Sequence, residues 1–524
     1  MNTRTWKGLT VAGVLCLAVG SCTDLTELPQ SSTTETNVFT DPASYASFLA
    51  KIYAGLALSG QQGPAGQPDI AGIDEGFSQY LRLYWETEEL PTEEAVIAWN
   101  DIGLPEMNTQ LWTPQSNMVV AMYYRIFFQV ALANEFLRQT TDDKLTARGN
   151  VTPALRDQIH TYRAEARFLR ALSYWHGIDL FGAIPLVTEN DPVGSTPPQQ
   201  STRVDLYNYV VSELTAIRTL LPSPGPSTYG RATGPAADML LAELYLNAGV
   251  YTGTPDYADA LTSAASVINS GYSLDPSYKH LFLADNNTSP EIIFAITQDG
   301  LKTQTYGAVT FLAHASCGGS MSNSTYGIDG CWWGLRLKRQ ADSNYTAGDN
   351  RSAFFYRAGQ TDTVYSIPTF QNGIAAPKFQ NVTSTGAPGS NGTFVDTDFP
   401  MFRLAEAYLI YAEAQLRGGG GAAATALGYV NALRERAYGG TSGDITAAQL
   451  TLDFLLAERG RELLWEAHRR TDLIRYGSFT GGNKLWEWKG GTLAGTATGS
   501  FRDLYPLPAS ELIANPNLKQ NPGY

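Results

Sequence analysis

Apolar positions recur at helical spacing along most of the chain. Repeated runs carry apolar residues three and four positions apart with polar residues between them, which is the pattern of amphipathic helices. Gly or Pro stands at many of their ends; segment 155–182, for example, stops at Gly182 with Pro185 just beyond it. The pattern predicts a mainly α-helical protein. The predicted helices lie within residues 121–139, 155–182, 203–222, 234–251, 256–272, 402–417, 422–440 and 450–477.

Four of these segments form two helix pairs. Segments 234–251 and 256–272 are joined by a short connector and carry small residues where two helices would cross, and segments 402–417 and 422–440 repeat the arrangement. Alanine and glycine at such crossings let helices approach closely, and the pairs resemble tetratricopeptide units. We therefore expect a tetratricopeptide-like helical scaffold.

The helical pattern stops between residues 299 and 399. Gly, Ser, Thr, Asn and Asp dominate this tract, and its aromatic residues follow no sustained period. Tracts of this length without regular structure are uncommon in compact domains and are often functional. We predict a large loop-rich insertion over 299–399, seated on the helical scaffold. Within it, the polar stretch "GGSMSNSTYGIDGCWWG" ends in Trp332 and Trp333, which either fill a hole from a loop or lie at a surface.

The N-terminal residues are typical of an exported lipoprotein. Arg4 and Lys7 precede an apolar run, residues 9–19, which is too short to span a membrane. The following "AVGSC" resembles a bacterial lipoprotein box, in which the signal is cut before the cysteine and the cysteine is acylated. We predict a signal peptide over residues 1–21 and a lipid anchor on Cys22, which attaches the protein to a membrane outside the cytoplasm. A plain secretory signal with an incidental cysteine is the alternative.

Net charge limits the kinds of partner that the protein can bind, and cysteine content limits the disulfides that it can form. Of the 524 residues, 16% are charged, and the net charge is -14. Binding to a phosphate backbone needs clustered Lys and Arg, so nucleic acid is not an expected partner. Only Cys317 and Cys331 would remain unmodified in the mature chain. An oxidising exterior permits them to form a disulfide, and both the paired and the free state remain open.

Catalytic and metal chemistry have weak support. A glycosidase needs two carboxylates at a defined separation across the scissile bond. Segment 86–94 is rich in glutamate, but such a cluster is usually a solvated face, and that is our prediction. The arginines and glutamates within 458–470 are interpreted as ion pairs on a helix surface, with His468 in a charge network at a helix end. The five histidines show no metal-ligand spacing. We expect no enzymatic activity, no cofactor and no metal site.

Six motifs, in this order, resemble the SusD/RagB family. They are "YRAEARFLRALSYWHGIDLFGAIPLVTE", "GRATGPAADMLLAELYLNAGVY", "EIIFAI", "FRLAEAYLIYAEA", "ERGRELLWEAHRRTDLIRYG" and "LYPLPASELIANPNLKQNPGY". The resemblance covers essentially the whole mature chain and implies an outer-membrane lipoprotein of the Bacteroidetes type. Members have a tetratricopeptide-like scaffold with irregular loops, bind glycans at the cell surface and cap a SusC-type TonB-dependent transporter. The resemblance implies an N-terminal region over 22–230 and a C-terminal region, with the insertion, over 231–524.

Residues 60–101 resemble the starch-type branch of this family. In that branch, residues of this region join loop aromatics in an arc against the sugar. The resemblance therefore makes Trp99 a candidate for stacking, and Asp74 and Arg82 candidates for binding sugar hydroxyls. Either Trp332 or Trp333 would supply the opposing ring.

Stacking on tryptophan suits carbohydrate chemistry. A pyranose presents C–H groups on one face and hydroxyls at its rim, and an indole covers the apolar face at little entropic cost. Asn100 and Asp101 stand directly beside Trp99 and offer hydrogen-bonding groups for the rim. Four other tryptophans lie in helical or apolar context and are predicted to be core residues: Trp85, Trp112, Trp175 and Trp465.

Together these expectations describe a glycan-binding lipoprotein without catalytic activity. It would capture oligo- or polysaccharide at the cell surface, a starch-like glucan among the candidates, and pass it to the SusC-type transporter. Two alternatives remain: a peptide-binding lipoprotein like the RagB branch, and a lid for the transporter with no ligand site of its own.

Overall fold

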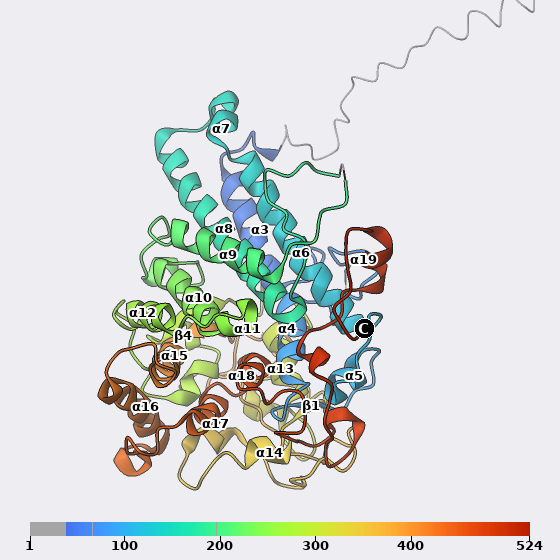
Figure 1. Ribbon diagram of the computed structural model, residues 1–524, viewed down its shortest axis with the longest axis vertical. Coiled ribbons are helices and arrows are strands. Elements are labelled where there is room, and N and C mark those ends of the chain that lie inside the picture. The colour runs from blue at the N-terminus through green and yellow to red at the C-terminus, as the bar shows by residue number, and fades with distance from the viewer. Residues whose placement is uncertain (1–37, 65, 195) are drawn as a thin grey trace, which may run out of the picture. The chain divides into compact units, whose positions relative to one another are not determined.

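Long helices occupy the segments whose apolar positions predicted them, which confirms the mainly α-helical class. The computed structural model describes residues 38–64, 66–194 and 196–524, so the predicted signal peptide and Cys22 lie outside the described residues. The longer helices (Figure 1) are α3 (Ala43–Ala57), α4 (Tyr80–Glu89), α6 (Asn117–Gln139), α8 (Pro153–Phe181), α9 (Arg203–Ile217), α10 (Gly234–Leu246), α12 (Tyr257–Ile268), α15 (Leu404–Leu416), α16 (Ala423–Tyr438) and α17 (Leu452–Glu462). The shorter ones are α5 (Leu104–Thr109), α7 (Asp142–Arg148), α11 (Ala248–Thr252), α13 (Ala308–Ala315), α14 (Arg339–Asp342), α18 (Arg469–Arg475) and α19 (Ala509–Ala514).

Helix α8 shows how local sequence sets these boundaries. Thr152 precedes the helix, and its side chain accepts a hydrogen bond from the backbone N–H of Leu155, which would otherwise lack a partner. Pro153 opens the first turn, where its missing N–H costs nothing. Gly182 ends the helix with a φ of 74°, a conformation that glycine adopts without strain.

The helices pack in neighbouring pairs. Helix α6 packs along α8 and α8 along α9, while α10 packs against α12 and α15 against α16. The last two pairs are joined because α12 also packs against α15 (Figure 1). Small residues make these contacts close: Ala260 and Ala264 of α12 are fully buried. The helix pairs predicted from the spacing of small residues are therefore present.

Strands are few among the described residues. β2 (Ile292–Ile296) pairs antiparallel with β4 (Phe399–Arg403), with Ile296 opposite Phe399, and every residue of both strands is buried. β1 (Val96–Ile97) pairs antiparallel with β3 (Leu335–Arg336). Each ladder joins one segment of the helical scaffold to a segment inside or bordering the predicted insertion.

The tract 299–399 is loop-rich, as predicted. Its regular elements are short: helices α13 and α14, strand β3, and the 3-10 helices η4 (Asn323–Tyr326) and η5 (Asn350–Phe354). Figure 1 shows much of this tract in yellow at the lower end of the molecule. The remaining 3-10 helices are η1 (Pro226–Thr228), η2 (Tyr278–Phe282), η3 (Asn286–Thr288), η6 (Thr441–Gly443), η7 (Lys489–Gly491) and η8 (Ser500–Asp503).

The single long helix predicted over 450–477 is wrong, because the chain breaks it into α17 and α18. Between them, Trp465 and Ala467 adopt φ values of 60° and 65°, which lie in the left-handed region. The break lets the Trp465 ring reach the core, where its Nε1 donates to the backbone oxygen of Glu94 at 2.9 Å. The carbonyl of Trp465 in turn accepts from Nε1 of Trp85 at 3.0 Å. Core contacts therefore override helix propensity here.

The glutamates of segment 86–94 are buried, so the predicted solvated face is wrong. Helix α4 packs against α6, α13 and α18, which leaves no side of it exposed. Arginines of the C-terminal segment neutralise several of these carboxylates, as in the pairs Glu88–Arg470 and Glu93–Arg469. Buried charges persist when they are paired in this way. The glutamates concerned are Glu86, Glu88, Glu89, Glu93 and Glu94.

The ion pairs predicted on a helix surface within 458–470 are also buried. Arg351, itself fully buried, contacts Glu458 at 2.7 Å and Glu462 at 2.9 Å. Arg403 of β4 extends the network to Glu462 at 2.8 Å and Glu466 at 2.6 Å. Arginines from outside the segment therefore tie its glutamates to η5 and β4 inside the protein. The buried arginines of this segment are Arg459, Arg461, Arg469 and Arg470.

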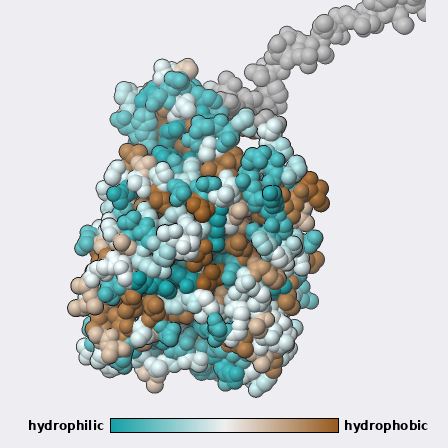
Figure 2. Space-filling model, viewed as in Figure 1, coloured by the Kyte–Doolittle hydropathy of each residue, from teal (hydrophilic) through white to brown (hydrophobic). Residues whose placement is uncertain are grey.

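Residues Tyr45–Tyr524 form one compact unit. The four tryptophans predicted as core residues, Trp85, Trp112, Trp175 and Trp465, are each at most 2% exposed. On the face shown in Figure 2, hydrophobic side chains form separate patches among hydrophilic ones. Across the described ranges, no helix has both the length and the apolar composition that crossing a membrane requires.

Candidate glycan-binding site

The β1–β3 ladder brings two distant tryptophans side by side. Just beyond the ladder, the backbone N–H of Ala98 donates to the carbonyl of Gly334 at 2.9 Å. Nε1 of Trp99 then donates to the carbonyl of Trp332 at 3.0 Å, and the two ring centroids lie 6.3 Å apart. Gly334 makes this close approach possible, because a Cβ atom there would lie only 3.0 Å from the Trp99 ring.

Helix α13 holds the loop that carries Trp332. The backbone N–H of Trp332 donates to the carbonyl of His314 at 2.9 Å, and that of Gly334 donates to the carbonyl of Ala315 at 2.8 Å. Carbonyls in the last turn of a helix lack intrahelical partners, so the loop satisfies two of them. The His314 ring also stacks on the Trp332 ring, with centroids 4.4 Å apart and an angle of 23° between the planes.

Tyr306 adds a third ring beside Trp332. Its centroid lies 6.2 Å from that of Trp332, with the planes 57° apart, and its ring is 36% exposed. Buried Phe394 supports it from a centroid distance of 5.5 Å. Trp99, Trp332 and Tyr306 thus form a row, which we call the aromatic platform. The planes of its neighbouring rings are tilted by 45° and 57° to one another.

Trp333 occupies a different environment from Trp332. It is 45% exposed, and its φ of 56° turns the chain in the left-handed conformation. Its ring packs against Phe370 at 5.7 Å, and no ring contact joins it to Trp99 or Tyr306 among the described residues. The structure thus separates the two tryptophans, and Trp332 is the one that belongs to the aromatic platform.

Arg82 lies behind the platform. Its guanidinium lies 5.6 Å from the Trp99 ring and 4.3 Å from the ring of buried Phe311. Nε donates to Glu86 at 2.8 Å and Nη1 donates to the carbonyl of Gly76 at 3.1 Å, while the side chain is only 7% exposed. Two of its N–H donors are therefore engaged by Glu86 and Gly76, while the guanidinium lies against the Trp99 ring.

The other predicted polar residues are exposed. Oδ1 of Asp74 accepts from the backbone N–H groups of Gly76 at 2.8 Å and Phe77 at 3.4 Å. It thereby orders the turn whose Gly76 carbonyl receives Arg82. Asn100 follows Trp99 directly, and within the described chain its side chain has no hydrogen-bond partner. Asn100 is therefore free to bind a ligand at the rim of the platform.

His314 is buried beneath Trp332. Nδ1 lies 2.6 Å from the carbonyl oxygen of Gly330 and Nε2 lies 3.0 Å from that of Thr393. Burial lowers the pKa of His314, and the two carbonyls and the charge of Asp329 oppose this shift. The contacts fix the orientation of the ring and, through stacking, that of Trp332.

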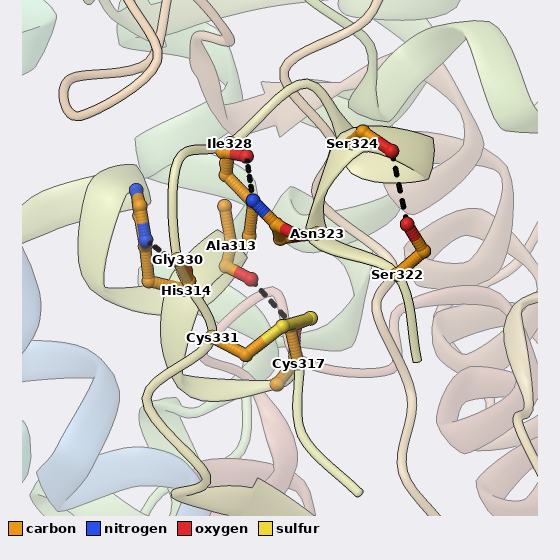
Figure 3. The surroundings of a disulfide bond; sticks show 10 residues. Ala313, His314, Cys317, Ser322, Asn323, Ser324, Ile328, Gly330 and Cys331 are labelled. Atoms are coloured by element: carbon orange, nitrogen blue, oxygen red, sulfur yellow. Dashed lines mark hydrogen bonds between the residues drawn. A yellow bond between two sulfur atoms is a disulfide. The ribbon is translucent and has the colours of Figure 1, made fainter. Parts of the chain in front are cut away.

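A disulfide joins Cys317 and Cys331 (Figure 3). It closes the loop that starts after α13 and returns at Trp332. Inside the loop, Nδ2 of Asn323 donates to the carbonyl of Ile328 at 2.8 Å. The backbone N–H of Trp333 donates to the carbonyl of Cys317 at 2.9 Å. The disulfide and this hydrogen bond therefore join the same two ends of the loop.

The arrangement can bind a ligand that has an apolar face and a polar rim. Partly exposed rings of fixed orientation offer area for stacking, because little side-chain freedom is left to lose. Sequence reasoning missed Tyr306 and His314. Tyr306 stands in the polar stretch "KTQTYGAV", the same kind of context that singled out Trp332, so the same criterion applied to tyrosine would have found it.

Comparison with known proteins shows the family to which this chain belongs. The model of the SusD family matches residues 290–524. The starch-binding protein SusD of Bacteroides thetaiotaomicron is 36% identical over 92% of this chain and 94% of its own. The chain therefore belongs to the SusD family.

Solved structures share the fold. A SusD superfamily protein from Bacteroides thetaiotaomicron aligns with a TM-score of 0.71 at 21% identity, over 92% of this chain and 99% of its own. Surface glycan-binding protein A from Bacteroides thetaiotaomicron, solved in complex with laminarihexaose, aligns with a TM-score of 0.69 at 22% identity, over 91% of this chain and 98% of its own. The helical scaffold and its loop-rich insertion are thus the architecture of this family.

Proposed function

We propose that this protein is a cell-surface glycan-binding lipoprotein that captures oligo- or polysaccharide on the aromatic platform. The observation that carries the proposal is the row Trp99, Trp332 and Tyr306, held from behind by Arg82 and His314. The name of the starch-binding relative supports an α-glucan as the first ligand to test. Asn100 and Asp74 are proposed to bind hydroxyls at the rim.

A binding role without catalysis fits the carboxylates. Glu86, the one closest in sequence to Arg82, is buried, and burial raises its pKa while Arg82 opposes the shift. The other glutamates of segment 86–94 are buried as well, so no member of this cluster faces a ligand on the platform. A glycosidase would need two carboxylates at the scissile bond, and this cluster does not provide them.

Membership of the family also supports a transporter as partner and the outer membrane as the cellular location. We propose that Cys22 is acylated, that the anchor holds the protein at the outer membrane, and that captured glycan passes to a SusC-type TonB-dependent transporter. Replacing Cys22 by Ala should then release the protein from the membrane fraction, as metabolic labelling with a fatty acid and fractionation would show.

Binding of polysaccharide tests the platform. The mature chain should be retarded by starch or another glucan in a native gel and should show a change in tryptophan fluorescence. Trp332→Ala should weaken binding at least about tenfold, equivalent to about 1.4 kcal/mol, because central aromatic contacts dominate binding energy. Titration calorimetry measures the affinity, and thermal melting confirms that the variant is folded.

Trp333→Ala is the matched control, since it removes an exposed indole from the same loop. It should retain most of the affinity. Equal loss in both variants would contradict the assignment of Trp332. Binding to no glycan, with oligopeptides co-purifying, would favour the peptide-binding alternative, and binding to neither would favour a transporter lid.

A further inference from the structure

A second cluster of polar side chains lies inside the scaffold, away from the platform. Glu243 of α10, Glu406 of α15 and His468, which precedes α18, each direct one ligand atom toward the others, and these atoms all lie within 4.8 Å of one another. The two glutamates are 1% exposed, and His468 is 7% exposed. Two helices and the residue before a third therefore converge on one buried point.

The cluster leaves carboxylate oxygens unpartnered. Both oxygens of Glu406 and Oε1 of Glu243 are buried without a hydrogen-bond donor among the described residues. Oε2 of Glu243 accepts from Nδ2 of Asn247 at 3.1 Å, so only the oxygen facing the cluster is left over. Nδ1 of His468 lies 3.6 Å from Oε1 of Glu406, which is too long for a hydrogen bond. Unsatisfied buried carboxylate oxygens are costly, so this arrangement needs a cation or a proton.

Neighbouring cations offset only part of the negative charge of the two glutamates. Arg459 is the closest, with Nη2 3.7 Å from Oε1 of Glu243, but its Nε is already bound to Asp472 at 2.7 Å.

We propose that Glu243, Glu406 and His468 form a structural site for a divalent transition-metal ion, with Zn²⁺ as the best fit. Two carboxylates and one imidazole are a ligand set that Zn²⁺ accepts, with water as a fourth ligand. Ca²⁺ fits poorly, because it takes six to eight oxygen ligands. The ion would link α10, α15 and the start of α18.

Metal content and stability test the site on the mature chain. Protein dialysed against Zn²⁺ and then against metal-free buffer should keep about one Zn²⁺ per chain by elemental analysis. Its Tm should fall with EDTA and recover with Zn²⁺, because an ion that binds only the folded state stabilises it. Protein loaded with Co²⁺ should show the visible absorption of a four-coordinate site.

Two variants separate the site from surface binding. Glu406→Gln keeps the side-chain size, and His468→Asn keeps a residue suited to a helix start; both should lose the retained Zn²⁺ and the Co²⁺ absorption. His160→Asn is the control, because His160 is an exposed residue of α8 beside Asp142 and its replacement should change nothing. Absence of retained Zn²⁺ in the unaltered protein would overturn the proposal and leave a proton shared between the two carboxyls. Retention unchanged in Glu406→Gln and His468→Asn would overturn it as well.

Discussion

Tyr306 is a partly exposed ring whose position is fixed by its aromatic neighbours. Phe394 supports one side of it, Trp332 stands beside it, and 36% of its surface stays open to solvent. No hydrogen bond from its hydroxyl to another described residue is present, so that group is available to a ligand. Tyr306 therefore offers a stacking face together with a polar tip.

Removing this ring should weaken glycan binding without unfolding the protein. Tyr306→Ala is expected to lower affinity about 2- to 12-fold, since an aromatic contact contributes about 0.5–1.5 kcal/mol. Tyr306→Phe should keep most of that affinity, because it retains the stacking face. Titration calorimetry with the glucan that binds the unaltered protein measures both effects.

Tyr365→Ala provides the comparison for this prediction. Tyr365 is 61% exposed and makes no ring contact with the platform, so its loss should leave affinity unchanged. Full affinity in Tyr306→Ala would show that the ligand contacts only the two tryptophans.

Single residues of the site were predictable to different degrees. Resemblance identified Trp99, and the polar context identified the pair Trp332 and Trp333. Choosing between that pair was not possible, because the choice depends on a left-handed turn at Trp333 and on the β1–β3 ladder. Arg82 was expected at the rim, yet its side chain is buried against Phe311, a contact between residues far apart in the chain.

At the scale of elements, the loop closed by Cys317 and Cys331 carries Trp332 into the aromatic platform. It lacks long helices or strands, and its base is held by the disulfide and by hydrogen bonds to the end of α13. Trp332 follows Cys331 directly. The fixed position of Trp332 in the platform therefore depends on the disulfide and on these hydrogen bonds.

Removing the disulfide should lower both stability and affinity. The Cys317→Ser/Cys331→Ser variant is expected to lose about 3 kcal/mol in the chain-entropy model, seen as a lower Tm. Affinity for glycan should fall too, because Trp332 must then be ordered on binding. A reducing agent should reproduce both changes in the unaltered protein and have no effect on the variant. Unchanged affinity in the variant would show that α13 alone holds Trp332.

Helices were the most predictable elements, and their breaks the least. The apolar period located α6, α8 and α16, since burial of one face follows directly from such spacing. The same period continues through 450–477, where the chain nevertheless turns at Trp465. That turn is imposed by hydrogen bonds between Trp465 and residues 371 and 380 positions earlier in the chain. A local sequence pattern cannot predict contacts over such separations.

At the scale of the whole molecule, buried charge replaces part of the hydrophobic core. The glutamates of segment 86–94 and the arginines of the C-terminal segment looked like two solvated faces because each was considered alone. Each is the counter-charge of the other: Arg469 binds Glu93, and Arg470 binds Glu88 and Asp179. Composition could not reveal this pairing, since it depends on the C-terminal segment packing against α4.

Breaking this network at Arg403 should destabilise the whole protein. Its guanidinium contacts Glu291 at 2.9 Å, Glu462 at 2.8 Å and Glu466 at 2.6 Å, all buried. Arg403→Met leaves these carboxylates with less counter-charge, which is expected to cost about 3–5 kcal/mol in the free energy of unfolding at pH 7. Urea unfolding followed by tryptophan fluorescence measures the loss.

The effect should depend on pH with a definite sign. Arg436, Arg403 and Arg351 hold the pKa of Glu462 well below its usual value against the opposing effect of burial. A carboxyl with a lowered folded-state pKa contributes stability above its unfolded pKa, about 4.3, and that contribution is lost as the pH falls further. The difference between the unaltered protein and Arg403→Met should therefore be largest near neutral pH and shrink below about pH 4. Arg156→Met, which breaks an exposed pair with Asp142, should leave the free energy of unfolding nearly unchanged at any pH. A cost for Arg403→Met as small as that of this control would mean that the buried network contributes little to holding β4 against the C-terminal segment.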